Sequence, residues 1–470
     1  MKILFCQAIT YPFIGIMSIS SVLKEFGYET DLKIFNISKP KPQDIEEIIQ
    51  YKPDVLAFPA YTGWHASIVK FCKDIKGRIN TVTVLGGPHP TYCPEVVHDD
   101  GVDYIVMGEA EISFVRLIKA IRNGEKEITT IDGVRCKTGG GGLSELPDLN
   151  DIPPMDIDLY RDRYDFIKKL THWEFSINRG CPFKCTYCNE PSLDKIYKGK
   201  AIRTKKPTNA IKEILHVMQK HPFKSCAFTS DNFTLNKEFS GEFLERYKKE
   251  VNVPFYCQMR PELLNLELAK QLKNANCHMI TMGVESGSPI IRREILNRPV
   301  TNERIIEACN ILKSVGIKIN LNNMVAIPGE KLEDSWETIK LNQVIKPDSS
   351  WCSIFQPYPK SRLTDKLLEK GELNIKDLER IPKSYFERSI LKIDNIHQFI
   401  NLHRFFYFVT KYQSLSSLVK LLIRMPDPYN KVFDVFFLVG FIAYVKKAYD
   451  KPLFSTIVTV LKNAFESIGK

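Results

Sequence analysis

The sequence lacks the apolar segments that would place it in a membrane or direct it to secretion. Its longest late apolar run, Val432 to Val445, has 14 residues and contains Asp434, whereas a membrane-spanning helix needs about 20 apolar residues. The first residues, Met1 to Ala8, lack the long apolar stretch and the small-residue cleavage site of a signal peptide. We therefore expect a cytoplasmic protein without a transmembrane helix.

The sequence also lacks a disulfide framework, although it contains 12 cysteines. Most of them stand singly within apolar runs, as Cys72, Cys226, Cys277 and Cys309 do. A free thiol in such a run packs as a small apolar side chain. This usage indicates a reducing, intracellular compartment.

Two nucleotide-binding motifs are missing as well. The pattern G-x-G-x-x-G is absent after the first predicted strand, and the phosphate loop G-x-x-x-x-G-K-[ST] is absent from the chain. These absences argue against an ordinary dinucleotide-binding domain and against a phosphate-loop enzyme.

Positive charge is concentrated near the C-terminal end. Residues Arg380 to Lys470 contain 14 Lys and Arg against 6 Asp and Glu, which supplies eight of the eleven net positive charges. A basic, aromatic-rich segment fits a helical cap with a solvated basic face, and it also fits peripheral contact with an anionic membrane. Both interpretations stay open, and we expect no nucleic-acid partner.

Strand-like and helix-like stretches alternate along the first part of the chain. Helix-like segments such as 18–28 and 66–76 separate the strands. This alternation predicts an α/β domain with a doubly wound, Rossmann-like parallel sheet, whose ligand binds beyond the carboxyl ends of the strands. The predicted strands are 2–8, 29–35, 54–61, 81–87 and 103–109.

A second alternating series follows a segment with four consecutive glycines and a Pro-Pro pair. Six β/α units predict a partial (β/α)6 barrel with its active site at the carboxyl ends of the strands. Its expected strands are 173–178, 225–231, 254–260, 279–285, 318–327 and 349–357. The expected domains are 1–138, a linker at 139–165, a barrel at 166–375 and a helical region at 376–470.

Three cysteines lie in the loop after the first strand of this second series. Cys181, Cys185 and Cys188 have the spacing C-x-x-x-C-x-x-C. A four-iron cluster normally takes four thiolates, so three leave one iron open, and an open position marks a reactive metal centre. A zinc site would instead need Cys226, Cys257 or a distant histidine as the fourth ligand.

This loop, with the aromatic Tyr187 just before the last cysteine, resembles the signature of radical SAM enzymes. The resemblance implies that Cys181, Cys185 and Cys188 hold a 4Fe–4S cluster, whose fourth iron is chelated by S-adenosyl-L-methionine. It further implies that Tyr187 lies beside the adenine of this cofactor. Reductive cleavage then yields a 5′-deoxyadenosyl radical, with the electron coming from a donor such as flavodoxin or ferredoxin.

Other strand ends resemble the same family. The segments Thr229 to Phe233 (TSDNF), Met282 to Ser288 (MGVESGS) and Met324 to Glu330 (MVAIPGE) resemble its cofactor-facing turns, although a glycine is more usual at Ala326. Arg260 also fits a surface ion pair, and this alternative stays open. The S-adenosylmethionine-binding residues that the resemblance implies are Asp231, Asn232, Arg260, Glu285, Ser286, Pro328 and Gln356.

The segments Val82 to Glu95 and Gly101 to Glu111 resemble the cobalamin-binding domain that is fused to many radical SAM enzymes. Glycines at the strand ends would let the backbone approach a flat macrocycle closely. The implied cobalamin-binding residues are Tyr61, Thr62, Gly86, Gly87, His89, Thr91, Gly108 and Glu109.

The first domain lacks the D-x-H-x-x-G motif with which many cobalamin proteins supply a histidine to cobalt. His65 and His89 are the histidines near the ligand-facing loops. We expect the lower face of cobalt to carry no histidine, with either residue as the alternative ligand.

The resemblance to cobalamin-dependent radical SAM enzymes covers Met1 to Leu373. It implies methylation of an unactivated carbon of a small molecule or lipid, with the deoxyadenosyl radical removing a hydrogen and methylcobalamin delivering the methyl group. Two alternatives stay open: oxidative cyclisation or rearrangement without methyl transfer, and a non-catalytic cobalamin sensor or carrier. Methylthio transfer is disfavoured, because the cysteines of the first domain are too scattered for a second ligand trio.

Overall fold

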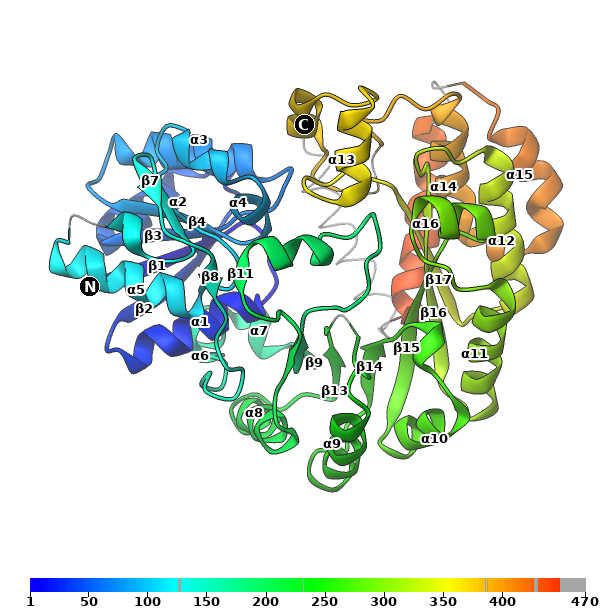
Figure 1. The fold of residues 1–470 in the computed structure, drawn as a ribbon, viewed down its shortest axis with the longest axis horizontal. Helices are drawn as coiled ribbons and strands as arrows, with labels where there is room; N and C mark the ends of the chain where they lie inside the picture. Colours follow the sequence, from blue (N-terminus) through cyan, green and yellow to red (C-terminus); the bar gives the residue numbers. More distant parts are fainter. Residues whose placement is uncertain (126–127, 231, 385, 387, 427–429, 449–470) are drawn as a thin grey trace. The chain divides into compact units, whose positions relative to one another are not determined.

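The computed structural model describes residues 1–470 except 126–127, 231, 385, 387, 427–429 and 449–470 (Figure 1). The chain divides into two compact units. The first unit comprises Met1–Pro182, Asn189–Asp231 and Glu245–Val253, and the second comprises Phe183–Cys188, Asn232–Leu244 and Pro254–Lys470.

The N-terminal part of the first unit is the predicted doubly wound α/β domain. All five predicted strands are present. The elements are β1 (Lys2–Gln7), α1 (Ile14–Glu25), β2 (Glu29–Ile34), α2 (Pro42–Tyr51), β3 (Val55–Pro59), α3 (His65–Lys76), β4 (Val82–Gly86), α4 (Pro88–Tyr92), β5 (Tyr104–Val106), α5 (Ala110–Asn123), β6 (Val134–Cys136), β7 (Gly139–Gly140) and β8 (Ser144–Glu145).

The strand order of this sheet is β2-β1-β3-β4-β5-β6-β7, and the first five strands are parallel. Residues of β1 alternate between the two faces. Leu4 and Cys6 pack in a core with Phe71 and other side chains of α2 and α3, whereas the ring of Phe5 lies 6.3 Å from that of Phe114 on α5. Helices therefore cover both faces of the sheet, so the carboxyl ends of the parallel strands form the open edge (Figure 1).

The segment that was expected to be a linker contains regular structure. Strand β6 pairs antiparallel with β5, and the glycines of β7 fold back on β6. Strand β8 pairs with β11 (Tyr197–Lys198) of the same unit. Helices α6 (Asp158–Arg161) and α7 (Asp165–Lys168) follow. The domain bounds expected from sequence stay a prediction.

The second series of strands alternates with helices as expected. In the first unit β9 and β13 pair in parallel, and in the second unit β14, β15, β16 and β17 pair in parallel in that order. The elements are β9 (His172–Phe175), β10 (Asn178–Arg179), β12 (Arg203–Thr204), α8 (Pro207–Lys220), β13 (Ser225–Phe228), α9 (Lys237–Glu250), β14 (Phe255–Gln258), α10 (Leu266–Asn274), β15 (Cys277–Glu285), α11 (Asn302–Ser314), β16 (Lys318–Val325), α12 (Leu332–Ile345) and β17 (Ser349–Ile354).

Local sequence signals account for several of these helix starts. Asn265 accepts a hydrogen bond from Leu268 N at the start of α10, and Thr301 accepts one from Arg304 N at the start of α11. Such side chains satisfy backbone N–H groups that a helix leaves unpaired. The caps end the loops at defined residues and so fix the lengths of the strand-end loops.

The remainder of the second unit is helical, as predicted. Helix α14 contributes Phe399, Leu402 and Phe406 to a core that it shares with Ile339 of α12 and Ile354 of β17. None of the helices in the described ranges is long and apolar enough to span a bilayer. The helices are α13 (Arg362–Glu369), α14 (Ile396–Lys411), α15 (Ser416–Leu422) and α16 (Asn430–Ala448).

Candidate functional site

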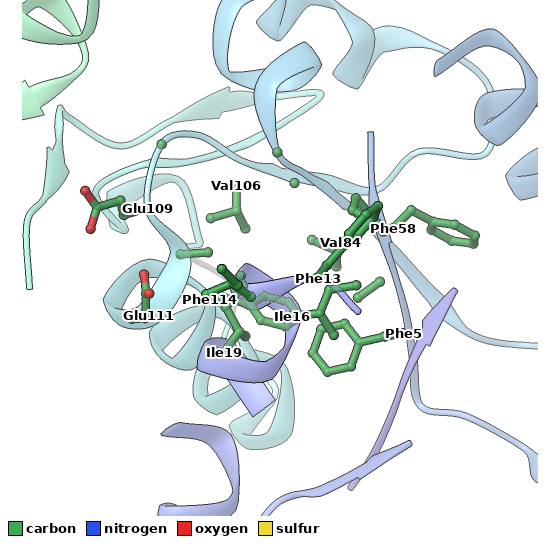
Figure 2. Close-up of a pocket in the computed structure, with 18 of the residues that line it drawn as sticks. Phe5, Phe13, Ile16, Ile19, Phe58, Val84, Val106, Glu109, Glu111 and Phe114 are labelled. Atoms are coloured by element: carbon green, nitrogen blue, oxygen red, sulfur yellow. The ribbon is translucent and has the colours of Figure 1, made fainter. Parts of the chain in front are cut away.

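A cavity of about 440 Å³ opens at the carboxyl edge of the first sheet. Its walls are mainly apolar and include Phe5, Phe13, Phe58 and Phe114. Figure 2 shows the carboxylates of Glu109 and Glu111 on one side of this cavity and the rings of Phe5 and Phe58 on the other. Five residues that the sequence predicts for cobalamin line the cavity: Tyr61, Gly86, Gly87, Gly108 and Glu109.

The glycines of this edge are required by the backbone. Gly87 has φ 92° and ψ −168°, and a Cβ there would lie 3.2 Å from Ala60 O. Gly108 has φ 72°, and a Cβ there would lie 2.4 Å from the ring of Tyr197. Thr91 joins the two loops, because its hydroxyl donates to Gly87 O at 2.7 Å and accepts from Gly108 N at 2.9 Å. Thr91 thus supports the cavity without lining it.

The predicted residues Thr62 and His89 lie together but do not line the cavity. Thr62 Oγ1 is 3.1 Å from His89 Nδ1, and the His89 ring stacks on that of His65 with centroids 3.7 Å apart. Burial, and then the neighbouring His65, lower the pKa of His89 to about 3. His89 is therefore a neutral, buried ring at physiological pH.

Four charged side chains are paired at one side of the cavity, and we call Glu109, Glu111, Arg179 and Arg203 the charge quartet. The first three line the cavity, and Arg203 pairs with Glu109 behind them. Arg179 donates from Nη1 to Glu109 Oε2 at 2.5 Å and from Nη2 to Glu111 Oε1 at 2.7 Å. Arg203 pairs with the other oxygen of Glu109. Glu111 also accepts from Ser18 Oγ at 2.8 Å.

The pKa shifts in the quartet follow from this pairing. Burial alone would raise the pKa of Glu111 and lower that of Arg179. The charge and hydrogen bonds of Arg179 outweigh burial and lower the pKa of Glu111, while the two carboxylates raise that of Arg179. Both groups are therefore ionised at neutral pH.

The cysteine loop begins two residues after Arg179. Cys181 belongs to the first compact unit, and Cys185 and Cys188 belong to the second. None of the three forms a disulfide. Within the part of the chain that the structure describes, no three His, Cys, Asp or Glu side chains are grouped as ligands for a metal ion. The ligation of an iron–sulfur cluster by the three cysteines stays a prediction. Three soft thiol donors in one short loop fit such a cluster.

Arg260 is buried against this loop instead of forming a surface ion pair in solvent. Its guanidinium lies 3.8 Å from the centroid of the Phe183 ring, donates from Nη1 to Cys185 Sγ at 3.3 Å, and pairs with Glu262 at 2.5 Å. The contact places Arg260 beside a predicted cluster ligand.

Tyr187 and Glu285 share the guanidinium of Arg298. Arg298 Nη1 is 3.5 Å from the Tyr187 hydroxyl and 3.9 Å from Glu285 Oε1, and its Nη2 donates to Gly283 O at 2.6 Å. Burial, and then Glu285, raise the pKa of Tyr187. Burial also raises the pKa of Glu285, and Arg298 opposes that shift. This group brings two predicted residues together at the end of β15.

The remaining predicted residues lie at other strand ends. Ser286 is buried and its hydroxyl accepts from Ser288 N at 3.2 Å, while Gln356 Nε2 donates to Arg388 O at 2.6 Å. Asn232 is buried, and Pro328 borders a wide cleft beyond β16. Asp231 lies outside the described residues.

Two strand-end residues have left-handed backbone conformations. Glu285 has φ 65° at a register shift between β15 and β16, and Ala326 has φ 59°. Glycine adopts this region without the strain that a Cβ introduces. Radical SAM enzymes more usually have a glycine at the position of Ala326, and the backbone of Ala326 has the conformation that glycine favours.

Sequence reasoning missed Arg179, Arg203, Glu111 and Arg298. Arg179 lies two residues before Cys181 and Glu111 lies two residues after Glu109, but isolated charges carry no pairing signal. The Arg–Glu pairs of the quartet join residues 68 or more positions apart along the chain, so folding alone reveals them.

The residues fit the predicted organic cofactors. In the first unit, glycines at two strand ends leave no side chains between the backbone and an apolar cavity. In the second unit, several buried polar atoms of the described residues have no hydrogen-bond partner, and two of them, Arg260 Nε and Gln356 Oε1, belong to residues predicted for S-adenosylmethionine. Buried polar atoms are normally paired, so both are available to a polar ligand.

Comparisons with known proteins agree with this arrangement. Residues 4–118 match the B12 binding domain, and residues 175–341 match the Radical SAM superfamily. An uncharacterized methyltransferase of Pyrococcus horikoshii is 29% identical over 372 residues, covering 75% of this chain and 78% of the relative. An anaerobic magnesium-protoporphyrin IX monomethyl ester cyclase of Rubrivivax gelatinosus is 25% identical over 384 residues, covering 77% of this chain and 67% of the relative.

A solved structure has a similar fold. It is the radical S-adenosylmethionine methyltransferase TsrM from Kitasatospora setae with cobalamin and a 4Fe–4S cluster bound. The TM-score is 0.66 at 14% sequence identity, and the match covers 78% of this chain and 75% of that chain. At this identity the likeness concerns the fold.

Proposed function

Because the chain carries a B12-binding domain followed by a radical SAM domain, it is a cobalamin-dependent radical SAM enzyme, and we propose that it methylates an unactivated carbon centre. Its cofactors are cobalamin, a 4Fe–4S cluster and S-adenosylmethionine. When bound, the cluster and S-adenosylmethionine supply a radical that removes a hydrogen atom from the substrate, and cobalamin supplies the methyl group. The substrate that we propose is a small molecule or a lipid.

The cavity at the edge of the first sheet carries this proposal. It is bordered by the glycine loops after β4 and β5 and by Arg179, which directly precedes the Gly-Cys pair of the cysteine loop. One apolar space in the first unit is therefore bordered both by the loops predicted for cobalamin and by the residue that introduces the first predicted cluster ligand.

The roles that we propose for individual residues follow from their surroundings. Gly86, Gly87 and Gly108 admit a flat ligand to the backbone, and the apolar walls exclude water from it. Cys181, Cys185 and Cys188 hold the cluster. Tyr187 and Glu285, which Arg298 holds in place, contact S-adenosylmethionine. Arg260 and Gln356 bind the same cofactor through their unpaired polar atoms.

Product analysis tests the proposal directly. The protein, reconstituted anaerobically with iron, sulfide and cobalamin, is incubated with a reductant, cell extract and S-adenosylmethionine that carries a labelled methyl group. Methyl transfer yields a labelled product together with both S-adenosylhomocysteine and 5′-deoxyadenosine. Cobalamin binding without any 5′-deoxyadenosine would instead identify a non-catalytic sensor or carrier.

A radical cyclisation or rearrangement is the second candidate, and the similarity to the Rubrivivax gelatinosus cyclase favours it. This reaction would consume substrate and form 5′-deoxyadenosine without S-adenosylhomocysteine. The same experiment therefore separates the two candidates by one product.

We also propose a small electron donor such as flavodoxin or ferredoxin, and a cytoplasmic location with peripheral membrane contact. Four exposed apolar side chains on one face of α16 support that contact: Val432, Val435, Phe436 and Val439. Basic residues of the same region would attract anionic lipid. Cosedimentation with vesicles that contain anionic lipid tests the contact, and recovery of all protein in the supernatant would remove it.

A further inference from the structure

The charge quartet connects two parts of the first unit that the proposed function uses differently. Glu109 and Glu111 lie at the start of α5, directly after Gly108 in the loop predicted for cobalamin. Arg179 lies two residues before Cys181, the first predicted cluster ligand. The ion pairs between them therefore tie the start of the cysteine loop to the edge of the cavity.

The two arginines of the quartet stand opposite each other on two paired strands. Strands β10 and β12 are antiparallel, and their register places Arg179 opposite Arg203. Like charges that lie directly opposite each other on paired strands destabilise the pairing. Glu109 offsets the repulsion, because one of its oxygens pairs with each guanidinium. The short β10–β12 pairing thus depends on a carboxylate from the cavity loop.

The contacts of Arg179 also fix its direction. Its guanidinium is planar and holds two carboxylates through two different nitrogens, which restrains the side chain more than a single contact would. Only 22% of the Arg179 side chain is exposed, and 6% of that of Glu111. An ion pair with so little solvent around it is weakly screened by salt.

The backbone on either side of Arg179 is held as well. Gly180 has φ 85°, and a Cβ there would lie 2.6 Å from Ala201 O. Ser230 Oγ accepts from Ile177 N at 3.3 Å and from Asn178 N at 3.2 Å. The backbone is therefore held on both sides of Arg179, and a single residue, Gly180, separates Arg179 from Cys181.

We propose that Arg179 is a positioning residue that fixes Cys181 relative to the cobalamin loop Gly108–Glu111. The proposal rests on the proposed function, because it concerns the coupling between radical formation and the use of that radical beside cobalamin. Without the ion pairs of Arg179, the radical still forms but at a shifted position relative to cobalamin. A shift of about 1 Å can lower the rate of the following step on the order of 100-fold.

Three variants and one control test this role. Arg179→Met removes the charge and both contacts, and Arg179→Lys keeps the charge but loses the planar fork. Glu109→Gln keeps the shape of the side chain but removes the carboxylate that the two facing arginines share. The control, Arg116→Met, removes an Arg–Glu pair from the exposed surface of α5, where Arg116 Nη2 lies 2.9 Å from Glu145.

Each protein is assayed for iron content, hydroxocobalamin affinity, and the ratio of labelled methyl product to 5′-deoxyadenosine. We expect Arg179→Met to retain 5′-deoxyadenosine formation while the ratio falls on the order of 100-fold. Arg179→Lys should give an intermediate ratio, Glu109→Gln a lowered one, and Arg116→Met the wild-type ratio. Parallel loss of product and 5′-deoxyadenosine, or an unchanged ratio in all variants, would overturn the proposal.

A spectroscopic readout keeps this test independent of methyl transfer. In the wild type, a reduced paramagnetic cluster changes the microwave power saturation of the cob(II)alamin signal according to the distance between the two centres. Arg179→Met should alter or broaden this effect, whereas Arg116→Met should not, and identical saturation in all proteins would contradict positioning. A wild type that forms 5′-deoxyadenosine but no S-adenosylhomocysteine refutes methyl transfer alone and leaves this comparison intact.

Discussion

Replacing Gly87 with alanine introduces a Cβ where the backbone leaves little room. Ala60 O would lie 3.2 Å and Ala60 N 3.3 Å from that atom, and neither can rotate away as a side chain could. The conformation itself, φ 92° and ψ −168°, is one that essentially only glycine adopts. Forcing another residue into it costs about 1–3 kcal/mol.

Gly124→Ala is the matched control for this change. Gly124 ends α5 with φ 66° and ψ 28°, and nothing lies within 4 Å of a Cβ built there. Its alanine variant should lose about 1–2 kcal/mol of unfolding free energy from the left-handed backbone alone. Gly87→Ala should lose more than Gly124→Ala, because crowding against Ala60 adds to the backbone strain.

The effect on cobalamin affinity follows from the same strain. If the Gly87 loop relaxes in the variant, the native conformation must be restored when the cofactor binds. If restoring the native loop costs about 1–2 kcal/mol of the binding free energy, cobalamin should bind roughly 5- to 30-fold more weakly. Gly124→Ala, which lies at the far end of α5 from the cavity loop, should bind like the wild type.

Anaerobic absorbance titration of each apoprotein with hydroxocobalamin measures the affinity, and urea denaturation measures the unfolding free energy. The reasoning is refuted if Gly87→Ala binds cobalamin as tightly as the wild type despite its lower stability. In that case the loop after β4 does not contact the cofactor.

Three further predictions concern other parts of the chain. Cys185→Ala should abolish 5′-deoxyadenosine formation and retain cobalamin binding, because the cavity lies in the other compact unit; unchanged 5′-deoxyadenosine would contradict the cluster assignment. The cob(II)alamin electron paramagnetic resonance spectrum should be the same in the wild type and in His89→Ala, because this ring is held by Thr62 and His65; nitrogen superhyperfine splitting that disappears in the variant would place the imidazole on cobalt. Burial raises the pKa of Glu330 from 4.5 to about 8. Between these two pH values the Glu330 carboxyl is protonated in the folded protein and ionised in the unfolded one, so the unfolding free energy should decrease as the pH rises. Urea denaturation of Glu330→Gln should show a weaker dependence of the unfolding free energy on pH, and an equal dependence in both proteins would disprove the shift.

The five parallel strands of the first sheet and the position of the cysteine loop were predictable because their signals are local. Alternating apolar residues and strand-end glycines identified β1 to β5, and three closely spaced cysteines need no knowledge of distant partners. The four-glycine run shows the limit of such a local signal. Its composition indicates a linker, but antiparallel pairing with β6 gives Gly139 and Gly140 a place in the sheet.

The charge quartet could not be predicted, since it depends on which distant segments meet. The position of Glu109 after Gly108 predicts a cobalamin contact, yet its carboxylate is held by Arg179 and Arg203. His89 was chosen in the same way and faces His65 instead of the cavity. Position at a strand end thus predicts which residues lie near the cavity, but the direction of each side chain depends on tertiary contacts.

The quartet has a consequence for the redox chemistry of a bound metal. Two carboxylates and two guanidiniums sum to zero net charge, so this wall should exert little net field on a cofactor beside it. Cobalt passes through oxidation states that differ in charge, and a wall with one uncompensated acid or base would favour one state over another. The midpoint potentials of cobalamin in this protein should therefore be set by the ligands of cobalt and by solvent access. They should shift when a single member of the quartet is neutralised.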